Sequence, residues 1–485
     1  MSVRRGIGIM FGGNVSTFII TFAASITIAR LLSPSELGIY AAAMALVSII
    51  NAVLNVGFSS YIVREREMPP EKLGSVLLLT LAQAVIIAGL LYLGAPLIGD
   101  FAHDQRVTIS VRILAWYGGL TSLLLTVFGI MQREMRFDRV VACTVVNVGL
   151  AAVVTIALAA TGWSWRSMPI GGGVGVSVAL VIALCMQRAD LAAARLGFSH
   201  VRPILAFGAK IIPPSIILNV TNRMPDIILT RAMGASANGL YNRGANLIDT
   251  FNNTVMQSVQ RVMQSQLARD RDTDAGIGPV YGVMNRMVTG LFWPLFALLG
   301  VLSAPLISLL FGAQWVAAAP VLAIVALAGA ISLIVACRGV VLITVGKEGT
   351  MARLEMVRGV IGVATFTVAA YTGGIVWAAA TRILDAVASV LLYSPGIHAA
   401  TQLSWATTAR GFVRSGLIAA ITAVPATVVM TIEGWPQHLP VLELIGVGLL
   451  SGATWLAAVF ALRHELAHEI TRAAGVARGL LPRIA

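Results

Sequence analysis

Long apolar runs recur along the whole of this 485-residue chain and constrain its fold more than any other feature. A bilayer core about 30 Å thick is spanned by about 20 apolar residues in a helix. Only 11% of the residues are charged, against about 25% in an average soluble domain, and the mean hydropathy is +0.87. The sequence therefore predicts an all-α polytopic membrane protein. We expect transmembrane helices at fourteen runs: 6–29, 39–58, 75–97, 111–131, 140–160, 171–187, 204–232, 239–265, 284–311, 318–345, 354–372, 375–393, 411–431 and 441–462.

The turns between these runs leave no room for a soluble domain, which usually needs roughly 50 residues or more. The three cysteines, Cys143, Cys185 and Cys337, lie far apart inside apolar runs and form no CxxC pair. The sequence also lacks a cluster of His, Asp and Glu with catalytic or metal-ligand spacing. We therefore expect no catalytic residues, no metal site and no cofactor, so an enzyme is disfavoured.

The basic residues concentrate in alternate turns. The formal net charge is +13, and 25 of the 34 Lys and Arg residues share one side if the first helix starts in the cytoplasm. Lys and Arg accumulate in the cytoplasmic loops of membrane proteins. We therefore expect both termini in the cytoplasm, and the dispersed charge does not favour a nucleic-acid partner. Nine basic residues do not fit this pattern: Arg30, Arg106, Arg112, Arg166, Arg223, Arg231, Arg243, Arg338 and Arg382.

A weak internal repeat relates the two halves of the chain. It predicts two pseudo-symmetric six-helix lobes, 1–200 and 201–400, followed by two further helices and a cytoplasmic tail in 401–485. Two such lobes related by an axis along the membrane normal can open alternately to either side, as transporters do. The identical positions, at an offset of 201, are Arg30 and Arg231, Ser35 and Ser236, Gly38 and Gly239, and Tyr40 and Tyr241.

Polar side chains form stripes on the predicted helices 204–232 and 239–265, with spacings of three and four residues. Polar groups inside a bilayer are expensive and point to water, to each other or to substrate. Amides suit sugar hydroxyls, and arginines suit phosphate. The alternative is that the amides hold helices together within a lobe. The candidate substrate-binding residues are Asn14, Arg30, Asn219, Arg223, Asp226, Arg231, Arg243, Asn246, Asn253 and Gln257.

Three acidic positions in the stripes and in run 375–393 have distinct interpretations. Arg223 and Asp226 are three residues apart and could simply neutralise each other. Arg382 and Asp385 have the same spacing, and for them we favour a structural pair. Asp249 has no basic residue three or four positions away, so it is the candidate ion-coupling carboxylate.

Three segments carry a resemblance to a known family. Residues 29–40 (ARLLSPSELGIY) resemble the turn between the first two helices of Wzx-type polysaccharide flippases, which belong to the multidrug/oligosaccharidyl-lipid/polysaccharide (MOP) exporter superfamily. Residues 129–139 (GIMQREMRFDR) resemble the cytoplasmic segment before the fifth helix of these proteins. Residues 311–320 (FGAQWVAAAP) resemble their turn before the tenth helix. The resemblance covers most of the chain and implies a fold like that of the multidrug MATE transporters.

The resemblance implies a flippase in the bacterial inner membrane. Such a protein moves an undecaprenyl-diphosphate-linked oligosaccharide between leaflets by alternating access coupled to an ion gradient. The product would be exopolysaccharide, capsule or the O-antigen of lipopolysaccharide. Membrane lipids, a polysaccharide polymerase and a chain-length regulator are the further partners it implies. Two rivals from the same superfamily stay open: a multidrug or cation antiporter, and a flippase of the peptidoglycan precursor.

Overall fold

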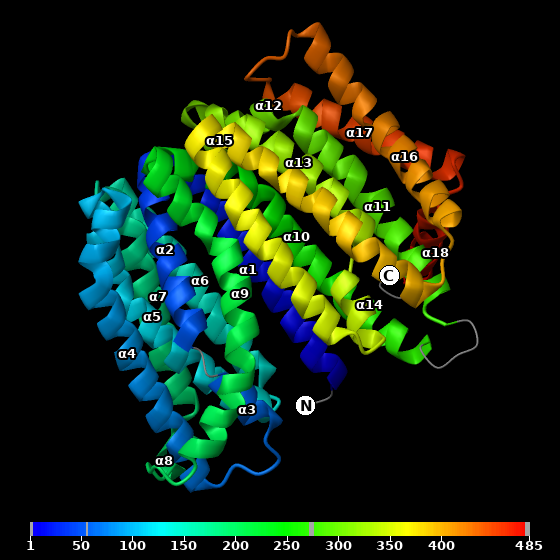
Figure 1. Cartoon of the computed structure of the whole chain (residues 1–485). Helices are drawn as coiled ribbons and strands as arrows, with labels where there is room; N and C mark the ends of the chain where they lie inside the picture. Colours follow the sequence, from blue (N-terminus) through cyan, green and yellow to red (C-terminus); the bar gives the residue numbers. More distant parts are fainter. Residues whose placement is uncertain (1–2, 55–56, 271–275, 481–485) are drawn as a thin grey trace. The chain divides into compact units, whose positions relative to one another are not determined.

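The computed structural model describes residues 3–54, 57–270 and 276–480, and it describes the backbone alone at 3–7, 11, 210–215, 217–218, 251–255, 257–258 and 473–480. Within these residues every regular element is a helix (Figure 1). Eleven of the helices there are long and apolar enough to cross a membrane. The prediction of an all-α polytopic membrane protein is therefore confirmed.

The number of fourteen spans stays a prediction. The element α15 (Glu348–Thr401) has 54 residues, but Gly374 has φ 82°, and this kink divides it into two helices. This glycine lies at the boundary expected between the runs 354–372 and 375–393. The long helices α9 (Val201–Met233) and α10 (Ala235–Asp270) are not among these eleven, and α10 carries many polar residues.

The chain forms two compact units, Met1–Asn242 and Arg243–Ala485, and α10 contributes to both. In unit 1, α4 packs on α5, α6 packs on α1 and α7, and α2 packs on α5 and α9. Besides α9 and the start of α10, the elements of this unit are α1 (Val3–Leu31), α2 (Pro34–Leu54), α3 (Phe58–Arg64), α4 (Pro70–Ala102), α5 (Gln105–Arg133), α6 (Phe137–Ala160), η1 (Ser164–Arg166), α7 (Ser167–Met186) and α8 (Arg188–Ala193).

In unit 2, α11 packs on α16 and α13 packs on α15. The short helix α18 contacts α11 and α17 near the carboxyl terminus of the described chain (Figure 1). The elements are α11 (Gly278–Val301), α12 (Ser303–Phe311), η2 (Ala313–Ala318), α13 (Ala319–Ser332), η3 (Leu333–Val335), α14 (Arg338–Thr344), α15, α16 (Trp405–Ile432), α17 (Val441–Ala461) and α18 (Glu465–Leu480).

The first family-like segment forms a capping box at the start of α2. The Ser33 backbone N–H donates to Glu36 Oε2 at 2.7 Å, and the Glu36 N–H donates to Ser33 Oγ at 3.4 Å. This reciprocal pair satisfies amides that the first turn of a helix leaves open. The Ser164 hydroxyl of η1 donates to the other carboxylate oxygen of Glu36. The segment is therefore a structural turn that also fixes η1.

The second family-like segment anchors the turn after α3. Arg133 donates from Nη1 to the carbonyl of Ile62 at 2.9 Å and from Nη2 to that of Arg66 at 2.9 Å, and it also contacts the Glu65 carbonyl. The last carbonyls of a helix have no partner within it, and a guanidinium can satisfy several at once. A single arginine thus holds the chain that connects α3 to α4.

The repeated glycines meet where α2 and the start of α10 cross. A Cβ added to Gly38 would overlap the carbonyl oxygen of Ala235, and one added to Gly239 would overlap that of Pro34. Pro34 and Ala235 are themselves related by the offset of 201, so the contact is reciprocal about a local two-fold axis. The helices can approach this closely only because neither glycine has a side chain.

The predicted lobes, 1–200, 201–400 and 401–485, stay a prediction. Lobes are defined by joint movement, whereas the two compact units are defined by packing. The packing places α9 with unit 1, on α2.

Candidate functional site

Asp226 is a buried carboxylate on α9 within unit 1. Its Oδ1 accepts a hydrogen bond from Asn242 Nδ2 at 2.6 Å, while its Oδ2 lies 4.0 Å from Arg223 Nη1. The side chain of Arg223 is 47% exposed and that of Asp226 only 8%. The structure therefore brings Arg223 and Asp226 together, but the short contact of the carboxylate is with the amide. The exposed guanidinium can still meet an anion.

Asn238 is fully buried and links three elements, although the sequence analysis did not select it. Its Nδ2 donates to Thr230 Oγ1 at 3.0 Å and to the Gly38 carbonyl at 3.2 Å, and its Oδ1 accepts from Asn242 at 2.8 Å. The sequence signal that could have identified Asn238 is its position inside the repeated turn, four residues before Asn242. These bonds tie the α9–α10 turn to α2, which is the helix-binding role of amides that the sequence analysis left open.

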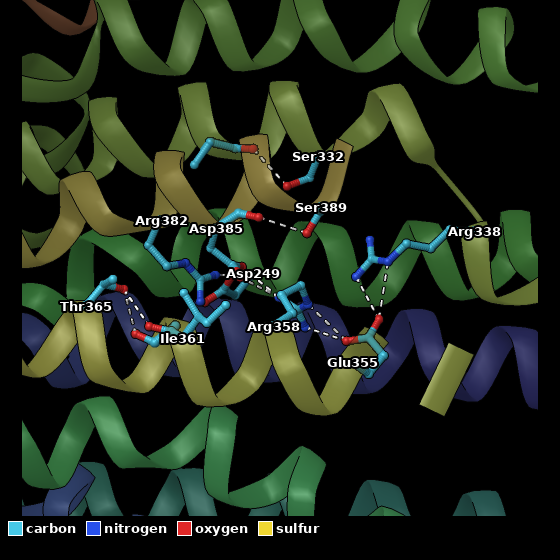
Figure 2. Close-up of polar contacts among 12 residues, drawn as sticks. Asp249, Ser332, Arg338, Glu355, Arg358, Ile361, Thr365, Arg382, Asp385 and Ser389 are labelled. Atoms are coloured by element: carbon cyan, nitrogen blue, oxygen red, sulfur yellow. Dashed lines mark hydrogen bonds and ion pairs between the residues drawn. The ribbon is translucent and has the colours of Figure 1, made fainter. Parts of the chain in front are cut away.

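Asp249 is paired across helices in unit 2. Its Oδ1 lies 3.1 Å from Nη2 of Arg382 on α15, and both side chains are 38% exposed (Figure 2). Asp249 has no basic neighbour one turn away on α10, but a basic partner reaches it from α15. Because the pair is half accessible, either group can exchange its partner for an ion from water.

A denser charge network lies beside this pair on α15. Arg358 donates to both Asp385 oxygens at 2.9 and 2.7 Å and to Glu355 Oε2 at 2.7 Å, and Arg338 reaches Glu355 Oε1 at 3.2 Å (Figure 2). Arg358 is only 15% exposed. The expected structural pair of Arg382 with Asp385 is not the arrangement found, since each of these residues bonds a different partner.

Arg243 is buried against the third family-like segment. Its guanidinium lies 4.5 Å from the centre of the Phe311 ring and 5.0 Å from that of Trp315. An arginine over aromatic faces is held by cation–π attraction. Arg243 is 8% exposed, so an anion could reach it only after these rings move.

The remaining candidates are scattered. Arg231 lies 5.6 Å from the Phe101 ring centre, and Asn219 lies on the wall of a cavity in unit 1. Asn14, Arg30 and Asn246 are exposed. The side chains of Asn253 and Gln257 lie outside the described residues. No cluster of three or more His, Cys, Asp and Glu residues with the geometry of a metal site occurs in the described part of the chain.

The fold is similar to that of solved MOP transporters. The lipid II flippase MurJ, in an inward closed conformation, matches with a TM-score of 0.75 at 13% identity, over 95% of this chain and 99% of that one. An inward-facing MATE-family multidrug transporter of the MOP superfamily matches with a TM-score of 0.65 at 15% identity, over 80% of this chain and 96% of that one. The chain is thus a multi-pass membrane protein with a MATE-like fold.

Residues 27–320 match the model of the family described as "Polysaccharide biosynthesis protein". The match covers more than half of the chain, and the chain belongs to this family. The resemblance to the polysaccharide flippases that was inferred from three short segments is therefore confirmed. The members and structural neighbours compared are named as transporters, flippases or biosynthesis proteins.

Three curated relatives extend the comparison. The succinoglycan biosynthesis transport protein ExoT of Rhizobium meliloti is 25% identical over 67% of this chain. The teichuronic acid biosynthesis protein TuaB of Bacillus subtilis is 21% identical over 61%, and the lipopolysaccharide biosynthesis protein WzxC of Escherichia coli is 20% identical over 62%. The matched region spans 66%, 61% and 62% of the lengths of these relatives, respectively.

Proposed function

We propose that this protein is a flippase that moves undecaprenyl-diphosphate-linked oligosaccharide repeat units across a bacterial inner membrane, by alternating access, for the assembly of a surface polysaccharide. The observation that carries the proposal is the family match over residues 27–320 on a fold shared with a lipid II flippase. The names of the relatives, which concern succinoglycan, teichuronic acid and lipopolysaccharide, support a polysaccharide precursor as the cargo.

The charges of unit 2 support a role in binding the diphosphate. Arg382 contacts the carboxylate of Asp249 and is partly exposed, whereas Arg358 is enclosed by two carboxylates. A phosphate group competes for a guanidinium through the same two-pronged hydrogen bonds that a carboxylate forms. Arg382 is therefore an additional diphosphate ligand in this proposal.

Ion coupling follows from the same pair. A proton or a sodium ion on Asp249 neutralises the carboxylate and weakens its hold on Arg382, 3.1 Å away. The guanidinium of Arg382 then binds the diphosphate, and release of the ion restores the pair with Asp249 and expels the anion. Ion and lipid thus affect each other's binding through one shared arginine.

The proposal is tested by deleting the gene and locating its lipid-linked precursor. We expect precursor to accumulate in the inner leaflet and the surface polysaccharide to be lost, with both restored by the full chain. Unchanged surface polysaccharide, in a strain without a second transporter of this kind, would exclude the function. Lysis with loss of lipid II transport would instead identify a peptidoglycan-precursor flippase, and a phenotype confined to drug sensitivity would identify an antiporter.

The coupling step is tested with Asp249→Asn in everted vesicles that carry the precursor. We expect the variant to move precursor at the same low rate with and without an imposed ion gradient, because the amide cannot be charged or discharged. Asp385→Asn is the matched control, since Asp385 binds the enclosed Arg358. It should reduce the amount of folded protein but keep the dependence on the gradient. An Asp249→Asn variant that still responds fully to the gradient would remove Asp249 from the coupling step.

A further inference from the structure

A polar cavity of about 460 Å³ lies within unit 1. It is surrounded by α2, α3, α4, α5 and α9, and its volume falls in the range of roughly 300–1,000 Å³ typical of small-molecule sites. None of the described residues that line it carries a charge. Its polar lining includes Asn51, Gln83, Thr121, Ser122, Thr126 and Asn219.

Three hydroxyl groups that line this cavity donate their protons to backbone carbonyls. Thr121 Oγ1 donates to the Tyr117 carbonyl at 2.7 Å, Ser122 Oγ to that of Gly119 at 3.0 Å, and Thr126 Oγ1 to that of Ser122 at 3.0 Å. A hydroxyl has one donor and two acceptor lone pairs. Each of these side chains therefore meets a ligand as a hydrogen-bond acceptor.

Gln83 adds an acceptor that has no hydrogen-bond partner. The residue is 8% exposed, it lines the cavity from α4, and its buried Oε1 forms no hydrogen bond in the structure. A buried carbonyl without a hydrogen-bond partner destabilises the folded protein. The terminal torsion of a glutamine rotates over a broad range, so the oxygen can turn to a donor that enters the cavity.

Together these features select a class of ligand. The four acceptors on Gln83, Thr121, Ser122 and Thr126 call for a molecule with several donors. The lack of Lys and Arg among the described lining residues disfavours phosphate, and the lack of Asp and Glu disfavours an organic cation. A neutral sugar, which carries a hydroxyl on most of its carbons, meets all three conditions.

We infer that this cavity is a subsite for a neutral sugar residue of the transported glycan, with Gln83 as its central hydrogen-bonding group. The inference rests on the proposed flippase function and adds where unit 1 contacts the glycan and which sugars it accepts. Sugars that carry a carboxylate are excluded, because the described residues of the cavity wall include no Lys or Arg.

The test is saturation-transfer NMR on the full chain in lipid nanodiscs, with glucose, galactose, mannose and glucuronate as probes. We expect transfer to at least one neutral hexose and none above background to glucuronate. Gln83→Met, which has a similar length and shape, should reduce the hexose signal at least fivefold. Gln187→Met is the matched control, since Gln187 is fully buried in the same unit, outside the cavity, and also has an unpartnered Oε1.

Equal hexose signals in the Gln83→Met variant and the natural protein would overturn the inference, as would a glucuronate signal as strong as that of the hexoses. Thr121→Val provides a second, milder variant and should weaken the signal by about twofold to fivefold. Binding is measured without transport, so its outcome is independent of the gene-deletion experiment. If the protein flips the precursor but binds no neutral hexose, only the subsite inference is rejected and the proposed function stands.

Discussion

Replacing Gly239 by alanine should destabilise the protein at one specific crossing of helices. The new Cβ would overlap the Pro34 carbonyl oxygen and lie 2.8 Å from its carbonyl carbon and 3.1 Å from the Gly38 nitrogen. These are backbone atoms, so no side chain can rotate out of the way. Overpacking of this kind costs about 1–3 kcal/mol, against a gain in helix propensity of up to about 1 kcal/mol.

The matched control is Gly89→Ala, on α4, where an added Cβ meets nothing within 4 Å. In Gly89→Ala only the gain in helix propensity applies. The free energies of unfolding of the two variants should therefore differ by about 2 kcal/mol, with Gly239→Ala less stable and Gly89→Ala more stable than the natural protein. For a body of 150–250 residues, this corresponds to melting temperatures roughly 4–8 °C apart.

The assay is thermal unfolding of the full chain in detergent, followed by the reaction of a fluorogenic maleimide with the buried thiol of Cys143 in unit 1. The natural chain has three cysteines, and a background that retains only Cys143 makes the signal specific. The Gly38→Ala/Gly239→Ala double variant should lose less stability than the sum of the losses of the two single variants, because the first methyl group already separates the helices. A Gly239→Ala protein as stable as Gly89→Ala would refute the close crossing.

Two further predictions concern buried polar groups. Asn238→Ala should lower the free energy of unfolding by about 2 kcal/mol in the same assay, since it removes three hydrogen bonds worth about 0.6 kcal/mol each on average in membrane proteins. Asn14→Ala, at an exposed position of the same unit, should leave the free energy of unfolding unchanged. Burial lowers the pKa of His464, which precedes α18, below its usual value of 6.5. The neutral ring of His464 is therefore favoured in the folded state. The contribution of this ring to stability is complete above pH 6.5 and declines as the pH falls below that value. Proteolysis of α18 in the full chain should accordingly accelerate between pH 7 and 5.5, and a His464→Gln variant with the same pH dependence would contradict this.

The sequence predicted the membrane class and most helix positions, because hydropathy and capping are local properties of the chain. The break at Gly374 and the capping box of Ser33 with Glu36 both fall where short segments indicated a turn. The contact of Arg223 with Asp226 was also foreseeable, since residues three apart share one helix face.

The partners across helices were not predictable in this way. Asp249 meets Arg382, which is 133 residues further along the chain, and Arg382 is not paired with its sequence neighbour Asp385. Gln83 stands alone in an apolar run and gave no signal, yet folding gives it a place in a cavity wall formed by five helices. Nothing in the spacing along one helix specifies which face of another helix it will meet.

The sequence by itself determined that this chain crosses a membrane many times, because an apolar helix is stable in lipid whatever its neighbours are. Three short segments of the sequence also indicated the polysaccharide flippase family. Only the tertiary structure decided which charges neutralise each other, which amides hold helices together and where neutral acceptors enclose a cavity. These depend on the register and rotation of packed helices, and in lipid that packing is set by close van der Waals fit at positions such as Gly38 and Gly239.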